Sequence, residues 1–424
     1  MKSRFSTLEE WLKWQETLHH KTIDLGLERV SRVFRKMGAQ RPAPVTVIVS
    51  GTNGKGSCVC LLEQIARHAG YKTGAYTSPH LLTYNERVRI NGVPAGDAAW
   101  LEAFAAVDAA RGEETLTYFE FGTLAAFHIF ARHSLDFAVL EVGLGGRLDA
   151  TNIIDTDAAL IASIGLDHQQ WLGSTREQIA REKAGIFRPE RPAVCGDTEP
   201  PAALFEIARN LGTPLSCLGR DFHYSTADGC WHWAGGDVEY RELPLPRMPG
   251  PAQLRNASSV LMLLRQLASR LTVDRRAIEE GLQSSILPGR QQILARQPQV
   301  LVDVAHNAEA MAELVLRLRS EPRRTHAVFT MLSDKPVVKA VRLLGPYVDA
   351  WYLAAAGGER ALAVSELAGI VAAQTSAGEP SCHASIADAF AAAHAVAEPQ
   401  ERILVTGSFW TVAEVMARYP GEGL

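Results

Sequence analysis

A glycine-rich loop that carries one lysine is the feature of this chain with the clearest chemistry. The loop consists of Gly51, Thr52, Asn53, Gly54, Lys55, Gly56 and Ser57. An apolar run over 45–50 predicts a buried strand before it, and 57–69 predicts a helix after it. Backbone N–H groups and the positive end of a helix hold phosphate, while a lysine adds charge and a serine hydroxyl can reach a metal ion. The loop therefore predicts binding of ATP or GTP.

The spacing within this loop departs from the common phosphate-loop pattern. That pattern places lysine directly before Ser or Thr and has a further glycine at its start. Here Gly56 separates Lys55 from Ser57, and Val49 stands at the outer glycine position. A glycine turn that binds nothing is the alternative, but a lysine inside such a loop is hard to explain by turn chemistry.

Polar side chains recur where other predicted strands end, and they form a candidate Mg²⁺ set. The set is Ser57, Ser78, Glu141 and His168. The carboxyl ends of parallel strands meet at one edge of a sheet, where ligands gather. Magnesium takes hydroxyls, one or two carboxylates and water, so His168 is an unusual member. Each residue alone has an ordinary structural explanation, although a buried Glu141 requires a partner.

Lys183 is a second notable lysine. It lies in a predicted helix over 175–184 and shares a face with Ile179, so it can point inward. Burial would make its amine more nucleophilic. A surface lysine is the alternative.

In the second half of the chain, Asp303 and His306 follow a predicted strand, and Arg290 lies just after a Leu-Pro-Gly break. An arginine at that position can hold phosphates. Asn307 can also cap the following helix without any ligand, which is the structural alternative.

The alternation of strands and helices predicts an α/β protein with two domains. The N-terminal domain, 1–286, is expected to be a P-loop-type ATPase domain with a mostly parallel sheet. Residues 222–245 predict a small antiparallel meander on the edge of that sheet. The smaller C-terminal domain, 287–424, is expected to be Rossmann-like. A short hinge should join the two domains.

Bulk composition limits the partners. Of 424 residues, 47% are hydrophobic and 21% charged, and the net charge is −4, which gives no reason to expect nucleic acid or an anionic membrane. No apolar run approaches the roughly 18 residues of a transmembrane helix. The six cysteines lack Cys-x-x-Cys spacing, so neither zinc nor a disulfide framework is indicated. We expect a cytoplasmic monomer.

Taken together, the motifs resemble the Mur ligase superfamily and, within it, the bifunctional dihydrofolate/folylpolyglutamate synthases of bacteria. The resembling segments keep the family order and span essentially the whole chain. They are 21–27, 51–57, 78–80, 116–120, 141–152, 166–168, 181–187, 287–290, 303–307 and 407–408.

The resemblance implies an ATP-dependent ligase that adds L-glutamate to dihydropteroate and to reduced folates. The acceptor carboxylate would attack the γ-phosphate to form an acyl phosphate, and the glutamate amine would then expel phosphate. Such a site works mainly by positioning and charge neutralisation.

The resemblance also implies roles for residues. Lys55 would neutralise phosphates, and two Mg²⁺ ions would use Ser57, Ser78, Glu141 and His168. Lys183 matches a lysine that becomes N-carboxylated in the superfamily, and His306 lies at the same predicted catalytic face as the nucleotide contacts. Those contacts would be Asn256, Arg290 and Asp303 in addition to the loop. The pteroate pocket would comprise Asp24, Leu25, Gly26, Leu27, Thr117, Tyr118, Phe119, Glu120, Leu148, Asp149 and Ala150.

Three alternatives remain at this stage. One is a folylpolyglutamate synthase without the dihydropteroate activity. Another is a muramyl-peptide ligase, disfavoured because such ligases usually carry a further N-terminal UDP-binding domain and only 44 residues precede the strand that leads into the loop. The third is a nucleotide-dependent switch without catalysis, disfavoured because Lys55, Glu141, His168 and Lys183 are all present.

Overall fold

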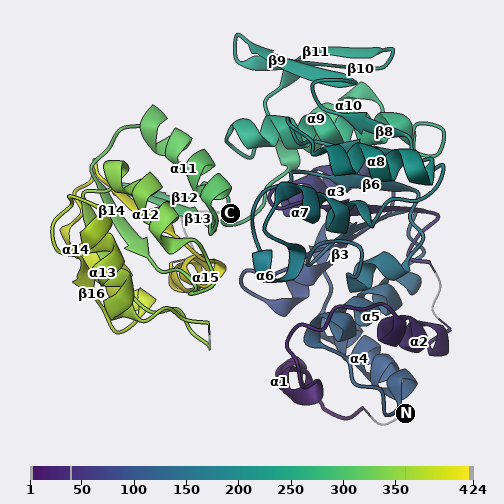
Figure 1. Cartoon of the computed structure of the whole chain (residues 1–424), viewed down its shortest axis with the longest axis horizontal. Coiled ribbons are helices and arrows are strands. Elements are labelled where there is room, and N and C mark those ends of the chain that lie inside the picture. The colour runs from purple at the N-terminus through teal and green to yellow at the C-terminus, as the bar shows by residue number, and fades with distance from the viewer. Residues whose placement is uncertain (1–2, 39–40, 359, 420–424) are drawn as a thin grey trace. The chain divides into compact units, whose positions relative to one another are not determined.

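The computed structural model describes residues 3–38, 41–358 and 360–419. The chain divides into two compact units: Met1–Arg247 with Gln253–Ile286, and Met248–Ala252 with Leu287–Leu424. Figure 1 shows both units as sheets covered by helices. In the described part of the chain no helix is both long and apolar enough to cross a membrane.

An eight-stranded sheet forms the centre of the first unit, in the order β4-β3-β2-β5-β1-β6-β7-β8. Strands β2, β5, β1, β6, β7 and β8 run parallel, while β3 and β4 are antiparallel at one edge. The strands are β1 Val45–Ser50, β2 Thr73–Tyr76, β3 Val88–Ile90, β4 Val93–Pro94, β5 Phe137–Glu141, β6 Ala158–Ile161, β7 Ala193–Cys195 and β8 Leu215–Cys217. The predicted parallel sheet is confirmed, and the edge strands β3 and β4 were missed because they are too short to show a period.

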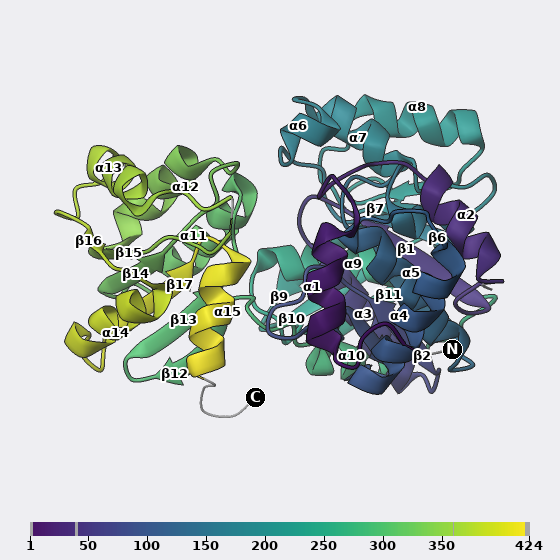
Figure 2. The ribbon, with the colours of Figure 1, turned by 90° about the horizontal axis from the view of Figure 1, so that it is seen from below.

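Helices cover both faces of this sheet. They are α1 Leu8–Leu18, α2 Glu28–Lys36, α3 Lys55–His68, α4 Asp97–Arg111, α5 Tyr118–Ala131, α6 Gln169–Leu172, α7 Arg176–Ala184, α8 Ala202–Leu211, α9 Pro251–Gln266 and α10 Arg275–Ser284, with 3₁₀ turns η1 Tyr84–Arg87 and η2 Ala150–Ile153. A hydrophobic core covers one face of the sheet. It combines Ile48, Leu140 and Ile161 of the strands with side chains of α1, α2, α4, α5, α7 and α8. Helix α3 instead packs on α10 and contacts β1, β2 and β5. Figure 2 shows that α7 lies beside α8 and that α4 lies beside α5.

The antiparallel meander is present, but its predicted place on the sheet edge is wrong. Strands β9 Phe222–Ala227, β10 Cys230–Gly235 and β11 Val238–Pro244 form a separate three-stranded sheet. Trp231 and Trp233 of β10 are buried, and the indole of Trp233 donates to the Ser258 carbonyl of α9. The meander therefore packs through its tryptophans instead of extending the main sheet.

A six-stranded sheet in the order β12-β13-β17-β14-β15-β16 forms the second unit. All pairs are parallel except β12 with β13, as expected for a Rossmann-like unit with one antiparallel edge strand. The strands are β12 Gln292–Arg296, β13 Gln299–Asp303, β14 Thr325–Phe329, β15 Ala350–Leu353, β16 Ser381–Cys382 and β17 Arg402–Thr406. The helices are α11 Ala308–Ser320, α12 Val337–Leu344, α13 Val364–Gln374, α14 Ile386–Val396 and α15 Phe409–Arg418, with the 3₁₀ turn η3 Gly345–Tyr347.

Local chemistry sets the helix starts that position the candidate site. Thr117 and Glu120 form a reciprocal capping box at α5, and Asn307 caps α11 through the Ala310 N–H.

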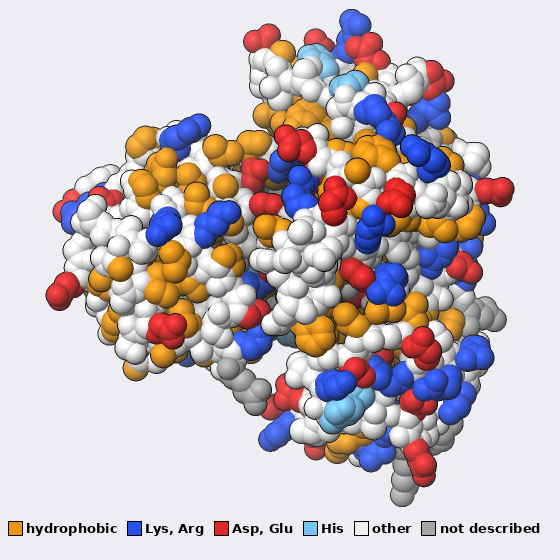
Figure 3. Space-filling model, viewed as in Figure 1, with side chains coloured by type: hydrophobic (Ala, Val, Ile, Leu, Met, Phe, Trp, Pro, Cys, Tyr) orange, Lys and Arg blue, Asp and Glu red, His pale blue; other side chains and the backbone are white. Residues whose placement is uncertain are grey.

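On the face seen in Figure 3, acidic and basic side chains alternate over the first unit. This face therefore presents a mixture of charges instead of a continuous basic surface.

Candidate active site

The glycine loop joins β1 to α3, as the sequence predicts, although α3 begins at Lys55 and not at Ser57. Gly54 has φ +83°, a conformation that side chains other than glycine rarely adopt. A Cβ there would lie 2.6 Å from Asn256 Oδ1. Glycine at this position therefore allows both the left-handed turn and the close approach of Asn256.

Hydrogen bonds to the segment after β6 hold the loop in shape. The Thr52 N–H donates to the Ser163 carbonyl at 2.9 Å, and the Asn53 N–H donates to Ser163 Oγ at 3.0 Å. The Thr52 hydroxyl and the Gly165 N–H are also bonded, at 2.9 Å. Lys55 Nζ donates to the Gly51 carbonyl at 2.9 Å, so its ammonium lies over the loop. The structure thus presents an ordered loop with a positive charge over it, a geometry that suits a phosphate group, and its predicted nucleotide contacts stay a prediction.

The candidate metal ligands lie at the same edge of the sheet. Glu141 ends β5 and is 4% exposed, and its carboxylate accepts the Ser78 N–H at 3.3 Å. Ser57, 3% exposed, lies in the first turn of α3. One buried carboxylate with hydroxyls beside a phosphate cradle fits a hard cation such as Mg²⁺. Within the described ranges no three His, Cys, Asp or Glu side chains cluster to hold a metal by themselves, so such an ion would depend on serine, phosphate and water oxygens.

His168 lies on the connection after β6, where it precedes α6 with φ +51°. Its side chain is 34% exposed, and Nε2 lies 4.0 Å from Asp167 Oδ2. The structure therefore places His168 on the correct edge of the sheet but in a more open position than Glu141. Its predicted metal role stays a prediction.

Lys183 is buried, with 2% exposure, near the end of α7. The expectation that it points inward is confirmed, and the surface alternative is wrong for this chain. A Cβ on Gly146 would lie 2.9 Å from the Lys183 carbonyl, so the loop that follows Glu141 packs directly on this helix end. The Arg147 N–H also donates to the Glu182 carbonyl at 2.8 Å. These contacts anchor Lys183 beside the segment that carries the candidate metal ligand.

Two segments of the predicted pteroate pocket meet at one half-buried arginine, Arg29. Arg29 Nη1 donates to Asp24 Oδ2 at 2.6 Å, and Arg29 Nη2 lies 2.9 Å from Glu120 Oε1. Glu120 Oε2 accepts the Thr117 N–H at 2.8 Å. This network connects the start of α2 to the start of α5, which carries Tyr118 and Phe119. The structure thereby links Asp24 with Thr117 and Glu120 through Arg29, while the predicted substrate contacts of 24–27 and 117–120 all stay predictions.

The third segment of the predicted pteroate pocket, 148–150, leads into η2, which contacts α5. A Cβ on Gly143 would lie 2.6 Å from Phe119 Cζ, so the ring of Phe119 lies on the loop after β5. Asp149 is 3% exposed and accepts the Leu144 N–H at 2.9 Å and the Thr151 hydroxyl at 2.6 Å. Burial raises the pKa of Asp149, an effect opposed by these hydrogen bonds. The loop that leaves Glu141 thus lies against the ring of Phe119, and the predicted pocket role of 148–150 stays a prediction.

The environment of Asp24 predicts a pH-dependent contribution to stability. Hydrogen bonds from Arg29 and Lys21 hold the pKa of Asp24 well below its usual range. A carboxyl with a depressed folded-state pKa stabilises the fold above its unfolded pKa of about 3.9 and loses that contribution as pH falls toward the folded value. We expect Asp24→Asn to lower the free energy of unfolding at pH 7, with a difference from wild type that shrinks at pH 3.

Urea unfolding of both proteins at the two pH values measures this difference. Glu113→Gln is a suitable control because the Glu113 side chain is exposed. An equal difference at pH 7 and pH 3 would contradict the proposed pairing of Asp24 with Arg29.

Sequence reasoning missed Arg87, which is 8% exposed beside this pocket. Its Nε donates to His80 Nδ1 at 3.0 Å, and its guanidinium lies 5.0 Å from the Tyr84 ring centre and 5.6 Å from that of Tyr118. Burial, with Arg87 nearby, lowers the pKa of His80 to about 4, so this imidazole is neutral near pH 7. Arg87 stands in a polar run that is typical of an exposed turn, so local sequence pattern carries no signal of its burial.

In the second unit, Arg290, Asp303 and His306 gather at the carboxyl edge of the sheet. Asp303 accepts the Gln291 N–H at 2.9 Å and the Ala305 N–H at 2.7 Å. Burial raises the pKa of Asp303, and Arg290 opposes that shift. The guanidinium of Arg290 lies 5.3 Å from the Phe409 ring centre, and the His306 ring lies 5.7 Å from it. The structure therefore brings together the three candidates of this unit, while their predicted contact with nucleotide stays untested.

Fold and site together define a ligase of the Mur type. The family model for the Mur ligase middle domain matches residues 49–200, which include the glycine loop, Glu141 and Lys183. The model for the Mur ligase glutamate ligase domain matches residues 289–409, which include Arg290, Asp303 and His306.

Among curated relatives, the dihydrofolate synthase/folylpolyglutamate synthase of Escherichia coli K12 is 46% identical over 97% of this chain and 95% of its own. The protein of the same name from Bacillus subtilis is 29% identical over 93% of this chain and 94% of its own. The chain belongs to the dihydrofolate synthase/folylpolyglutamate synthase family of ATP-dependent ligases.

Solved structures of this family have the same fold as this chain. Escherichia coli FolC in complex with DHPP and ADP is 44% identical, with a TM-score of 0.93 and 99% of both chains covered. A bifunctional folylpolyglutamate synthase/dihydrofolate synthase with Mn, AMPPNP and L-glutamate bound is 42% identical, with a TM-score of 0.91 and coverage of 98% of this chain and 99% of that chain.

Proposed function

We propose that this protein uses ATP and a divalent cation to join L-glutamate to dihydropteroate and to reduced folates. One observation carries the proposal. The loop that follows Glu141 contacts the ring of Phe119 through Gly143 and packs on the helix end of Lys183. A predicted metal ligand, the predicted acceptor pocket and a buried lysine thus share one short segment. The relatives that bind DHPP, ADP, AMPPNP and L-glutamate support the same substrates.

In the reaction that we propose, an oxygen of the acceptor carboxylate forms a bond to the γ-phosphorus of ATP as ADP leaves. The glutamate amine then attacks the acyl carbon of this acyl phosphate, loses a proton and expels phosphate. Lys55 neutralises the transferring phosphate from the loop, and the cradle N–H groups orient it. Mg²⁺, held by Ser57, Ser78, Glu141 and His168, would add charge stabilisation at the phosphates. We also propose a catalytic role for His306 and a nucleotide contact for Arg290.

Lys183 has a distinct proposed role. Its ammonium would first lose a proton, and the neutral amine would then react with CO₂ to form a carbamate and release a second proton. The two losses convert a buried cation into an anionic group. A carbamate oxygen can help to order the metal ions, and this explains why a lysine rather than a carboxylate is placed beside the Glu141 loop. The relatives' bound ions support the metal, and the modification itself is our proposal.

We also propose that the protein works in the cytoplasm as a monomer. ATP, folates and free glutamate are all available there, and its cysteines are free thiols in the structure, as reducing conditions would keep them. Sedimentation of the purified protein would test the monomer, since a concentration-independent mass near 46.2 kDa is expected.

Mass spectrometry of products tests the function directly. Purified protein is incubated with Mg²⁺-ATP and L-glutamate, with dihydropteroate in one tube and tetrahydrofolate in another. We expect one added glutamate in the first tube and further additions in the second. Addition only to tetrahydrofolate would leave a folylpolyglutamate synthase, and no product in either tube would point to a different amide ligase or a nucleotide switch.

A further inference from the structure

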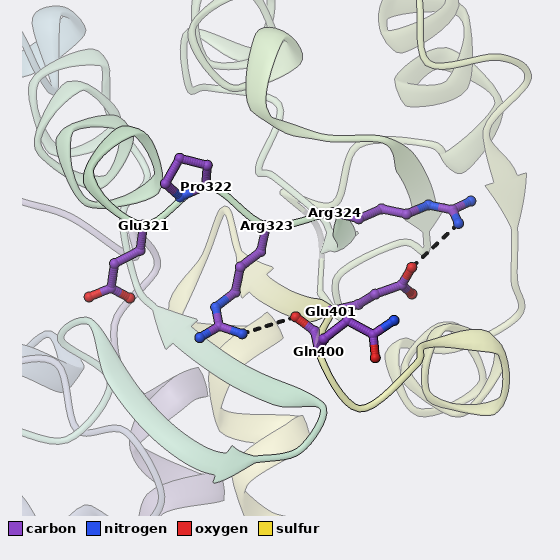
Figure 4. A pocket seen from close by; sticks show the side chains of 6 residues that line it. All are labelled: Glu321, Pro322, Arg323, Arg324, Gln400 and Glu401. Atoms are coloured by element: carbon purple, nitrogen blue, oxygen red, sulfur yellow. Dashed lines mark hydrogen bonds and ion pairs between the residues drawn. The ribbon is translucent and has the colours of Figure 1, made fainter.

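The second unit contains a pocket at the amino ends of its strands, opposite the edge that carries Asp303. Its volume is about 620 Å³, within the range of small-molecule sites. It is lined by Glu321, Pro322, Arg323, Arg324, Gln400 and Glu401, which we call the basic pocket. Figure 4 shows Arg323 reaching toward Gln400 and Arg324 reaching toward Glu401 from the other wall. The reaction proposed above uses none of these residues.

Arg323 is a cation without a carboxylate partner among the described residues. Its Nη1 donates to the Gln400 carbonyl at 2.9 Å, which is a neutral acceptor. Arg324 is 64% exposed, and its Nη1 lies 3.4 Å from Glu401 Oε1, a long contact. Both guanidinium groups can therefore turn to an incoming anion at small cost.

The carboxylates that face the basic pocket are already engaged. Glu401 Oε2 lies 2.9 Å from His326 Nε2 and accepts the Glu398 N–H at 3.0 Å. Glu321 Oε1 is paired with Arg317 Nη2 at 2.8 Å. Neither acid is therefore available to neutralise Arg323.

A fourth arginine, in addition to Arg323, Arg324 and Arg317, is buried next to the basic pocket. Arg402 is 1% exposed and donates to Gln299 Oε1 at 2.7 Å and to the Glu321 carbonyl at 2.8 Å, with its nearest carboxylate oxygen 3.7 Å away. Burial lowers the pKa of Arg402 to about 10; Glu321 opposes this shift, while Arg323 and Arg317 add to it. Glu398 and Asp349 also lie at this edge, where they accept from the Gln400 side chain and the Thr325 N–H. Of the four arginines, Arg323 is the one for which the described residues provide no ion pair.

We propose that the basic pocket binds a phosphate group, with Arg323 as its main ligand and Arg324 as the second. Arginine suits this ligand because its planar fork matches phosphate oxygens. Bound phosphate would relieve the repulsion among the arginines without displacing an existing ion pair of Arg323. The phosphate can come from the free ion or from a small monoester. The proposal does not depend on the ligase activity.

Calorimetric titration of the AMPPNP-saturated, Mg²⁺-loaded protein tests this site, because the three phosphorus groups of this analogue would fill both the glycine loop and the position of the transferred phosphate. Inorganic phosphate and glycerol 3-phosphate are titrated separately at constant ionic strength. We expect saturable binding of at least one, and at least a tenfold weaker affinity in Arg323→Gln. Whichever of the two binds more tightly identifies the source of the phosphate.

Arg418→Gln is the matched control, since its side chain is 68% exposed in the same unit. It should bind phosphate as wild type does. Thermal unfolding of each variant establishes that Arg323→Gln is folded. Absent binding in wild type, equal affinity in folded Arg323→Gln, or an equal loss in Arg418→Gln would overturn the proposal.

Discussion

Replacing Lys55 with alanine should lower the turnover of glutamate-dependent ATP cleavage by about a hundredfold or more, equivalent to roughly 3 kcal/mol of transition-state stabilisation. The ammonium lies over the glycine loop, with Nζ 2.9 Å from the Gly51 carbonyl. It can therefore turn from that carbonyl to a phosphate oxygen without moving the backbone. Negative charge develops on the transferring group during the reaction, so the loss should fall mainly on kcat.

Steady-state kinetics with ATP, glutamate and each acceptor measure this effect. Lys72→Ala is the matched control, because Lys72 is an exposed lysine of the same unit. Its rate should stay close to that of wild type. Near-normal turnover of a folded Lys55→Ala protein would remove the lysine from the phosphate cradle.

A comparably large loss is expected for Lys183→Ala, with a distinctive means of recovery. If the buried amine functions as a carbamate, its removal deletes an anionic oxygen group next to the Glu141 loop. Short carboxylic acids such as acetate can enter the space left by the side chain and supply such a group. We therefore expect turnover to fall about a hundredfold or more and to recover in part as acetate is added.

Lys55→Ala is the control for rescue, since acetate cannot replace its positive charge. In addition, ¹³C-labelled bicarbonate should give wild-type protein a carbamate resonance that Lys183→Ala lacks. A folded Lys183→Ala protein that acetate does not rescue, together with no such resonance in wild type, would refute the carbamate.

Much of the fold follows from local pattern. The strand at 45–50, the glycine loop and the helix after it are adjacent in sequence, so periodicity and glycine chemistry were sufficient to predict them. Placement of the meander was wrong because short apolar strands do not encode which sheet they join. The strands β3 and β4 were overlooked for a related reason, since three and two residues respectively show no reliable alternation.

The sequence by itself determined which chemical groups follow which strands, because the order of residues along the chain fixes that relation. Tertiary structure alone decided which distant groups meet. Arg29 reaches Glu120 across 91 positions of sequence, and Asn256 lies against Gly54 from a helix far along the chain. Burial of Lys183, the partners of Arg87 and the basic pocket around Arg323 likewise arise from long-range packing. Such contacts depend on how whole elements pack against one another, a relation that local periodicity does not carry.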